Sequence, residues 1–115
     1  MVCVFGCGGE RDPGKRPEMG AVAERLADVV VLTSDNPRGE DPQAIINDIL
    51  GGFQRPVRIQ SERGLAIASA VIEADLHDVI LIAGKGHELY QEIAGLRHPF
   101  SDIDAAKSAL ARRQS

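Results

Sequence analysis

Aromatic side chains are scarce in this 115-residue chain, which has no tryptophan, one tyrosine and three phenylalanines. Proteins that bind single-stranded nucleic acid stack bases on such rings, so the composition argues against a base-stacking surface. Positive charge does not gather in any segment either, because 13 basic residues are set against 17 acidic ones for a net charge of −4. Nucleic-acid-binding domains usually carry a basic patch, so this class is excluded on both grounds.

Long apolar runs and an export signal are also missing. No stretch approaches the roughly twenty residues that span a bilayer, and no basic region precedes an apolar one at the N-terminus. Cys3 and Cys7 are the only cysteines, and they do not form a C-x-x-C pair. We interpret them as reduced core residues of a one-domain cytoplasmic protein with no membrane partner.

Four short apolar runs alternate with four patterns of helical periodicity. The runs cover residues 2–5, 29–32, 57–59 and 79–83. Their near-continuous apolarity is typical of parallel strands that are covered on both faces. The succession predicts an α/β fold, a Rossmann-like and mainly parallel sheet with helices on both faces. Residues 89–99 weaken the pattern and predict a short antiparallel hairpin or edge strand near the C-terminus.

The helical patterns are expected at about residues 17–27, 42–50 and 61–74, and from residue 101 onward. Asp41 is a plausible N-cap ahead of a proline at the first helical position, and the spacing from Ser101 to Asp104 resembles a capping box. The first pattern places four apolar side chains on one face: Met19, Val22, Ala23 and Leu26. The last is expected to turn three side chains inward: Ile103, Ala106 and Leu110. Arg63, at the start of the third helix, is expected to be exposed.

Polar loops, two of them rich in glycine, follow three of the four apolar runs. They cover residues 6–16 (GCGGERDPGKR), 35–38 (DNPR) and 84–88 (GKGHE). In open α/β sheets, ligands bind beyond the carboxyl ends of the strands, where these loops begin. We therefore expect one ligand site on a rim that the three loops share.

The tetrapeptide Asp35-Asn36-Pro37-Arg38 carries the most chemical information. Pro37 fixes its own φ and pushes Asn36 toward extended geometry, so the flanking groups point in set directions. Arg38 can grip a carboxylate through two hydrogen bonds, while Asp35 and the Asn36 oxygen can accept from an ammonium group. A small zwitterion suits this set. The alternative is an ordinary turn in which Asp and Asn bond their own backbone.

The first loop contains part of a phosphate-binding P-loop, G-x-x-x-x-G-K, over residues 9–15. We reject this match, because Arg16 stands where a magnesium-binding hydroxyl is needed and Pro13 removes a backbone N–H. A dinucleotide fingerprint fails as well, since Arg11 occupies the place of its third glycine. What remains is either a ligand surface or a solvated loop, and it presents Glu10, Arg11, Asp12, Lys15 and Arg16.

The third loop has glycines at positions 84 and 86, where backbone can approach a ligand closely, and Glu88 supplies a carboxylate for an ammonium group. His87 has no histidine partner at metal-ligand spacing, so we interpret it as structural. We predict no metal site and no catalytic residue in this chain.

Together the motifs GCGGERDPGKRPxMG, DNPR and AGKGHExYQ, in this order and at these spacings, resemble the C-terminal domain of the Mur ligases. More narrowly, they resemble the MurE type, which adds meso-diaminopimelate to UDP-N-acetylmuramoyl-L-alanyl-D-glutamate in peptidoglycan biosynthesis. DNPR is the segment by which that type differs from the enzymes that add lysine. The resemblance makes residues 1–115 one such domain without its first strand and helix, and the open sheet edge this leaves is a possible surface for self-association.

The resemblance also implies roles for particular positions. The substrate-binding residues that the resemblance implies for this chain are Arg11, Asp35, Asn36, Pro37, Arg38, Gly84 and Glu88. Arg11 and Arg38 would hold the carboxylate at the far end of meso-diaminopimelate, and Gly84, through its backbone, and Glu88 would take the ammonium of the same centre. Lysine lacks that carboxylate and would leave both arginines unpaired.

The family reaction uses ATP and Mg²⁺ to turn a glutamate carboxylate into an acyl phosphate, which the incoming amine attacks. The resemblance assigns ATP, Mg²⁺ and the UDP-sugar dipeptide to the ligase's N-terminal and central domains, and neither cofactor to this chain alone, which is expected to be inactive by itself. Glu10 stands where the family commonly has Asp and is a possible ATP contact. Two alternatives stay open: a non-catalytic amino-acid-binding module and a nucleotide-binding α/β module.

Overall fold

The computed structural model describes residues 1–9, 14–75, 77–83, 90–93 and 96–114. The elements, in chain order, are β1 (Val2–Phe5), α1 (Lys15–Leu26), β2 (Val29–Leu32), α2 (Pro42–Leu50), β3 (Arg58–Ile59), α3 (Arg63–Glu73), β4 (Ile80–Ala83), β5 (Tyr90–Ile93), β6 (Leu96–Pro99) and α4 (Asp102–Gln114). None of the helices in these ranges has the length and apolar character needed to cross a membrane.

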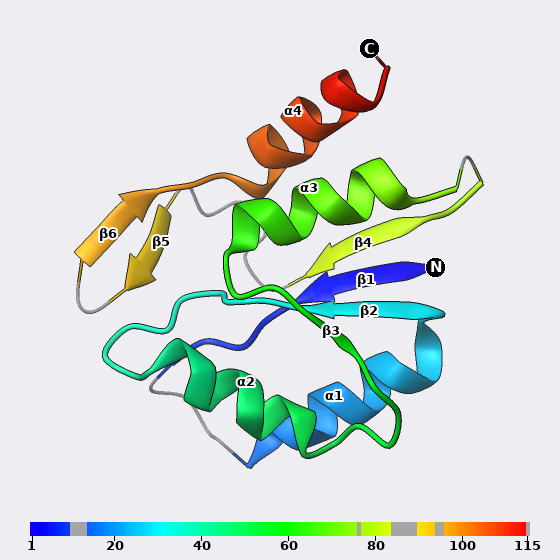
Figure 1. Ribbon diagram of the computed structural model, residues 1–115. Coiled ribbons are helices and arrows are strands. Elements are labelled where there is room, and N and C mark those ends of the chain that lie inside the picture. Colours follow the sequence, from blue (N-terminus) through cyan, green and yellow to red (C-terminus); the bar gives the residue numbers. More distant parts are fainter. Residues whose placement is uncertain (10–13, 76, 84–89, 94–95, 115) are drawn as a thin grey trace.

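Four strands form one parallel sheet in the order β3-β2-β1-β4 (Figure 1). β1 pairs with both neighbours in matching register, so that Val2 lies opposite Val29 on one side and Ile80 on the other. β5 and β6 form a separate antiparallel hairpin. The predicted Rossmann-like α/β fold and the predicted C-terminal hairpin are therefore both confirmed.

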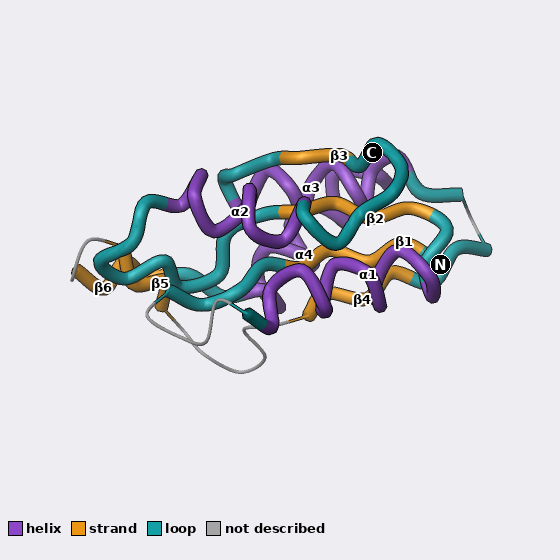
Figure 2. The backbone as a smooth tube through the Cα atoms, turned by 90° about the horizontal axis from the view of Figure 1, so that it is seen from below, coloured by secondary structure: helices purple, strands orange, loops and turns teal. Residues whose placement is uncertain are grey.

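Alternate residues of the two central strands supply two separate cores, one on each face of the sheet. Val4 and Val31 pack against α3 and α4 on one face. Phe5 and Leu32 pack on the other face, where α1 and α2 lie. Figure 1 shows the two helix pairs on opposite sides of the strands, and Figure 2 is the view from below, from the side on which α1 and α2 lie. The sheet is thus held between two layers, and the loops at its ends are the places left for a ligand.

Cys3 and Cys7 are both free and buried, as predicted. Burial raises the pKa of each thiol above its ordinary value of 9.0. Because the unfolded chain would lose these protons first, burial of the neutral thiols supports the fold below about pH 9 and ceases to do so as the pH rises further.

The predicted helix starts at Asp41 and Ser101 are confirmed. The Asp41 side chain accepts a hydrogen bond from the Gln43 N–H at 3.1 Å. Ser101 Oγ accepts from the Asp104 N–H at 3.3 Å. Caps of this kind satisfy N–H groups that have no partner within the helix, and each contributes about 1 kcal/mol.

The predicted inward face of α4 is wrong in part. Ile103 and Leu110 are 50% and 48% exposed, whereas Asp102 and Ala109 are buried. The reason lies in the close packing of α4 on α3, where small side chains meet. The alanines in and beside this core are Ala66, Ala68, Ala70, Ala105, Ala106 and Ala109. Larger side chains such as Ile103 and Leu110 do not fit this contact, so they point to its outside.

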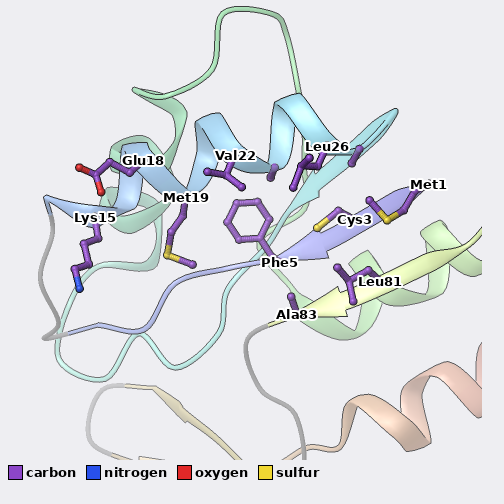
Figure 3. A pocket seen from close by; sticks show the side chains of 12 residues that line it. Met1, Cys3, Phe5, Lys15, Glu18, Met19, Val22, Leu26, Leu81 and Ala83 are labelled. Atoms are coloured by element: carbon purple, nitrogen blue, oxygen red, sulfur yellow. The ribbon is translucent and has the colours of Figure 1, made fainter.

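An apolar groove lies between α1 and the β4 side of the sheet (Figure 3). It has a volume of about 400 Å³ and is lined by the predicted apolar face of α1 together with Cys3, Phe5, Leu81 and Ala83 of the sheet. Among the strands that the structure describes, β4 pairs only with β1. The open edge that a missing first strand would leave is still an expectation. Self-association through that edge stays a prediction.

Two helical glycines should respond to alanine with opposite signs. A Cβ on Gly20 would lie 2.5 Å from the Ile49 carbonyl oxygen and 2.9 Å from the Phe53 ring, at the contact of α1 with α2. A Cβ on Gly64 would meet its nearest atoms at 3.4 and 3.5 Å, which is ordinary contact. Gly20→Ala should lower the free energy of unfolding by about 1 to 3 kcal/mol. Gly64→Ala should raise it by about 0.5 to 1 kcal/mol.

Urea unfolding followed by circular dichroism measures both values on the purified chain. A free energy of unfolding that does not fall in Gly20→Ala would contradict the packing described for α1 and α2, and one that does not rise in Gly64→Ala would contradict the open space described at Gly64.

Candidate functional site

The carboxyl ends of β1, β2 and β4 lie at one edge of the sheet, and the β5–β6 hairpin lies beyond that edge (Figure 1). We call this edge the rim. Four of the predicted site residues are described there: Asp35, Asn36, Pro37 and Arg38. The others lie outside the described residues: Glu10, Arg11, Gly84 and Glu88, together with Asp12 and His87.

The loops that leave β1 and β2 run against each other, main chain to main chain. The Thr33 N–H donates to the Phe5 carbonyl at 2.9 Å, and the Gly9 N–H donates to the Asn36 carbonyl at 2.6 Å. A Cβ on Gly6 would overlap the Thr33 carbonyl oxygen, and one on Gly9 would overlap the carbonyl of Pro37. Glycine at both positions is what allows this approach. The DNPR segment is thereby joined to the loop that leads on to residue 11.

Every main-chain carbonyl from Ser34 to Pro37 accepts a hydrogen bond. The donors, in the order of these acceptors, are the Arg63 guanidinium, the Gln91 side-chain amide, the Gly9 N–H and the Glu40 N–H, at 3.2, 2.7, 2.6 and 3.0 Å. These donors come from α3, β5, the loop after β1 and the chain ahead of α2. The path of the tetrapeptide is therefore fixed from four directions before any ligand arrives.

The tetrapeptide divides into an inner and an outer part. Asn36 is 2% exposed and Pro37 is fully buried, whereas Asp35 and Arg38 are half-buried. The two charged side chains are thus only partly covered and lie next to a buried support, and one carboxylate oxygen of Asp35 is itself buried. The expected contact of the Asn36 side chain with a ligand stays a prediction, and its position in the interior also suits a role in shaping the loop.

Arg38 has the backbone conformation that L-residues rarely adopt, with φ at 54°. Its Nη1 donates to the Gly9 carbonyl at 2.9 Å and to the Asn36 carbonyl at 3.3 Å. A non-glycine residue in this region costs about 1 to 3 kcal/mol and persists when its surroundings determine it. Both bonds use Nη1, and a guanidinium carries further N–H donors on Nε and Nη2. The Arg38 guanidinium is thus held in place on its Nη1 side.

Arg16, which the sequence places in the charged loop, is 2% exposed and is not a surface residue. Its Nη1 donates to Asp48 at 2.9 Å and to Glu40 at 3.0 Å, and its Nη2 donates to Glu40 at 2.9 Å and to the Gly8 carbonyl at 3.1 Å. The hydrogen bonds that Arg16 donates to Glu40 are the main cause that raises the pKa of Arg16. Arg16 therefore ties the loop after β1 to α2, and the expectation that it meets a ligand or solvent is wrong.

Arg63 was expected to be exposed and is instead 1% exposed, so that prediction is wrong. It forms a bidentate ion pair with Asp102, in which the Nε–Oδ1 and Nη2–Oδ2 distances are both 2.7 Å. A signal in the sequence does place it inside, because it lies four and seven positions before the buried residues Ile67 and Ala70. Helical periodicity puts all three on one face.

The described part of the rim brings charged groups of both signs close together. It offers a guanidinium and a carboxylate at fixed places, which suits a ligand with charges of both signs. No group of three His, Cys, Asp or Glu side chains in the described ranges is placed to hold a metal ion.

Comparisons with known proteins agree on one family. Residues 1–86 match the family described as "Mur ligase, glutamate ligase domain". The UDP-N-acetylmuramoyl-L-alanyl-D-glutamate--2,6-diaminopimelate ligase of Acidovorax sp. strain JS42 is 64% identical over 115 residues, which cover 98% of this chain and 23% of that protein. The ligase of the same name from Chromobacterium violaceum is 60% identical over 111 residues, covering 96% of this chain and 22% of that protein.

A solved structure of a protein of that name superposes with a TM-score of 0.93 at 44% identity. The superposition covers 99% of this chain and 24% of that one. The chain thus spans less than a quarter of the length of these relatives.

The contact at Gly9 gives a test of the rim. Gly9→Ala should separate the two loops, because the added methyl group overlaps the Pro37 carbonyl. We expect the amide signals of Asp35, Asn36 and Arg38 to move in a nitrogen–proton correlation spectrum, and the free energy of unfolding to fall by about 1 to 3 kcal/mol. Gly64→Ala is the matched control and should leave those signals in place. Unmoved signals in Gly9→Ala would contradict the described contact.

Proposed function

Since this chain belongs to the Mur ligase family, we propose that it is the amino-acid-recognising C-terminal domain of a ligase that adds meso-diaminopimelate to UDP-N-acetylmuramoyl-L-alanyl-D-glutamate. The reaction belongs to peptidoglycan biosynthesis, and we propose a cytoplasmic location for it. The observation that carries the proposal is the braced DNPR segment, which presents Arg38 at the rim on a fixed main chain. The names of the relatives support it, because the proteins similar to this chain are diaminopimelate ligases.

Each charged group of the ligand has a partner of opposite sign in this proposal. Arg38 and Arg11 bind the distal carboxylate, and Glu88 with the Gly84 backbone binds the ammonium group of the same centre. Asp35 adds a second carboxylate on the ammonium side. Asn36 and Pro37, which are buried, hold the segment in shape.

The two ends of meso-diaminopimelate then have different roles, since one end is bound and the other reacts. Each end carries one amine and one carboxylate, and the rim holds one end through both groups. The amine of the other end stays available for the reaction. Holding the amino acid in one orientation removes much of the entropic cost of bringing the two substrates together.

Discrimination against L-lysine follows from the same contacts. Lysine has an amine at its far end but no carboxylate, so it would leave the two arginines without their partner. Leaving one member of a desolvated charge pair unsatisfied costs about 2 to 5 kcal/mol. Arg38 is half-buried, and solvent screening places its share near the lower end of that range.

ATP and Mg²⁺ do not fit the described part of this chain. The P-loop match at residues 9–15 fails at Pro13 and Arg16, and Arg16 is buried against Glu40 and Asp48. We therefore assign both to the remaining domains of the full-length ligase, which we also propose as the site of the UDP-sugar substrate. Glu10 stays a proposed contact to ATP from this side. No step of the recognition described here depends on either group.

A chimeric enzyme tests the proposal. In the Acidovorax sp. JS42 ligase, the matching 115 residues are replaced by this chain, and phosphate release is measured with meso-diaminopimelate and with L-lysine. The folded chimera should use meso-diaminopimelate with a kcat/KM at least about 100-fold above that for L-lysine, because only the former pairs with both arginines. A folded chimera that does not add meso-diaminopimelate overturns the proposal.

A single substitution in this chimera tests the role of Arg38. Arg38→Ala should lower kcat/KM for meso-diaminopimelate about 30-fold, mainly through KM, which corresponds to about 2 kcal/mol. Arg25→Ala is the matched control, because Arg25 is an exposed arginine in the last turn of α1. A kcat/KM that stays within about twofold in Arg38→Ala would show that this guanidinium does not hold the ligand.

A further inference from the structure

We propose that Arg63 is a positioning residue for amino-acid recognition. Its guanidinium lies beneath the rim and ties the carboxyl ends of β2 and β4 to each other, while Asp102 of α4 holds the guanidinium in the orientation that this requires. The inference deepens the proposed function and rests on it for its enzymatic readout.

The contacts of Arg63 join three separate elements at one point. Nη1 donates to the Ser34 carbonyl at 3.2 Å, and Nη2 donates to the Ala83 carbonyl at 3.1 Å. Nε and Nη2 each donate to one oxygen of Asp102 at 2.7 Å. These bonds use four of the five N–H groups that a guanidinium has. Because the guanidinium is planar and rigid, these bonds restrict the positions of all three partners relative to one another.

The two carbonyl acceptors are placed where they matter for the rim. Ser34 directly precedes Asp35 of the tetrapeptide, and Ala83 is the last residue of β4, directly before the GKGHE segment in the sequence. Parallel strands β2 and β4 do not touch, because β1 lies between them. Arg63 therefore supplies a direct link between two strand ends that the sheet itself does not pair. The position of Ser34, which leads into the tetrapeptide, relative to the end of β4 depends on this link.

Stability alone gives a weak reason for this ion pair. Its two side chains are 0% and 7% exposed, and removing two charges from water costs about as much as their attraction returns. An apolar pair of similar volume would often serve the fold equally well. What an apolar pair would not supply is a set of directional bonds to the two carbonyls.

Arg63→Lys is the substitution that separates charge from geometry. Lysine keeps the positive charge at Asp102, but its ammonium is a single point on a flexible stem and does not reach all three partners as a fork does. In the chimeric ligase, KM for meso-diaminopimelate should rise about 10- to 100-fold, which is the effect expected from a misplacement of about 1 Å. KM for ATP should stay within about twofold, because the ATP site lies in other domains.

Val71→Ala is the matched control for a general loss of stability. Val71 lies in the same helix and in the core beneath the sheet, so its truncation lowers the melting temperature through a cavity without touching the rim. A melting temperature that falls in both variants, with a raised KM for meso-diaminopimelate only in Arg63→Lys, supports positioning. An unchanged KM in a folded Arg63→Lys enzyme, or an equal rise in Val71→Ala, overturns it.

Asp102→Asn serves if Arg63→Lys does not fold, since it keeps the shape of the side chain and removes its charge. It should raise KM for meso-diaminopimelate in the same direction while kcat stays within about twofold. A folded Asp102→Asn enzyme with the wild-type KM counts against the proposal.

A second measurement needs no ligand and separates this inference from the proposed function. In the 115-residue chain, Arg63→Lys should move the amide signals of Asp35, Asn36 and Arg38, whereas Val71→Ala should leave them in place. If the wild-type chimera does not add meso-diaminopimelate, the proposed function fails, and these signals still decide whether Arg63 sets the path of the rim. Unmoved signals in Arg63→Lys overturn the inference whatever the substrate is.

Discussion

Contact between two main chains, where the loops leave β1 and β2, is the constraint on which the rest of the rim depends. Gly6 and Gly9 have no side chain to keep the loops apart, so the carbonyls of Thr33 and Pro37 occupy the space where a Cβ would stand. The hydrogen bond from the Gly9 N–H to the Asn36 carbonyl then closes the contact. The Arg38 guanidinium donates a hydrogen bond to the carbonyl of the same glycine. The position of the charge that we assign to ligand binding therefore follows from backbone geometry.

Two buried arginines connect the loops at this contact to the helices on the two faces of the sheet. Arg16 connects the loop after β1 to α2 through Glu40 and Asp48, and Arg63 connects the ends of β2 and β4 to α4 through Asp102. In each case the charge is balanced by carboxylates, and the guanidinium also donates to at least one main-chain carbonyl. A guanidinium suits this task because it offers several donors in one plane. The helices on both faces are thereby coupled to the loops at the end of the sheet.

Much of the fold could be predicted because its signals are local. Near-continuous apolar runs indicated parallel strands, and Asp41 and Ser101 marked helix starts that the structure confirms. The placement of the DNPR segment at a strand end followed from the same pattern. The inward face of α4 could not be predicted from apolarity, because the close contact with α3 selects small side chains over large ones.

The burial of Arg16 and Arg63, which hold the site in place, was not predicted for a different reason. A single sequence shows that Arg16 and Arg63 are charged, but their partners lie 24, 32 and 39 positions away along the chain. Charged residues at the start of a helix are usually solvated. For Arg16 the packing of distant elements reverses that expectation, whereas for Arg63 the helical spacing to Ile67 and Ala70 was a local signal. The φ of Arg38 is likewise set by the surrounding loops and not by its neighbours in sequence.

The backbone of Arg38 has a consequence for engineering. Its positive φ favours glycine on conformational grounds, so the native arginine is held there at a cost to stability. A library selected only for thermal tolerance would weigh the relief of this backbone strain in glycine or asparagine against the two hydrogen bonds of Nη1, and it would give no weight to the binding role of the guanidinium. Selection for heat resistance and selection for substrate choice therefore act on different properties of residue 38.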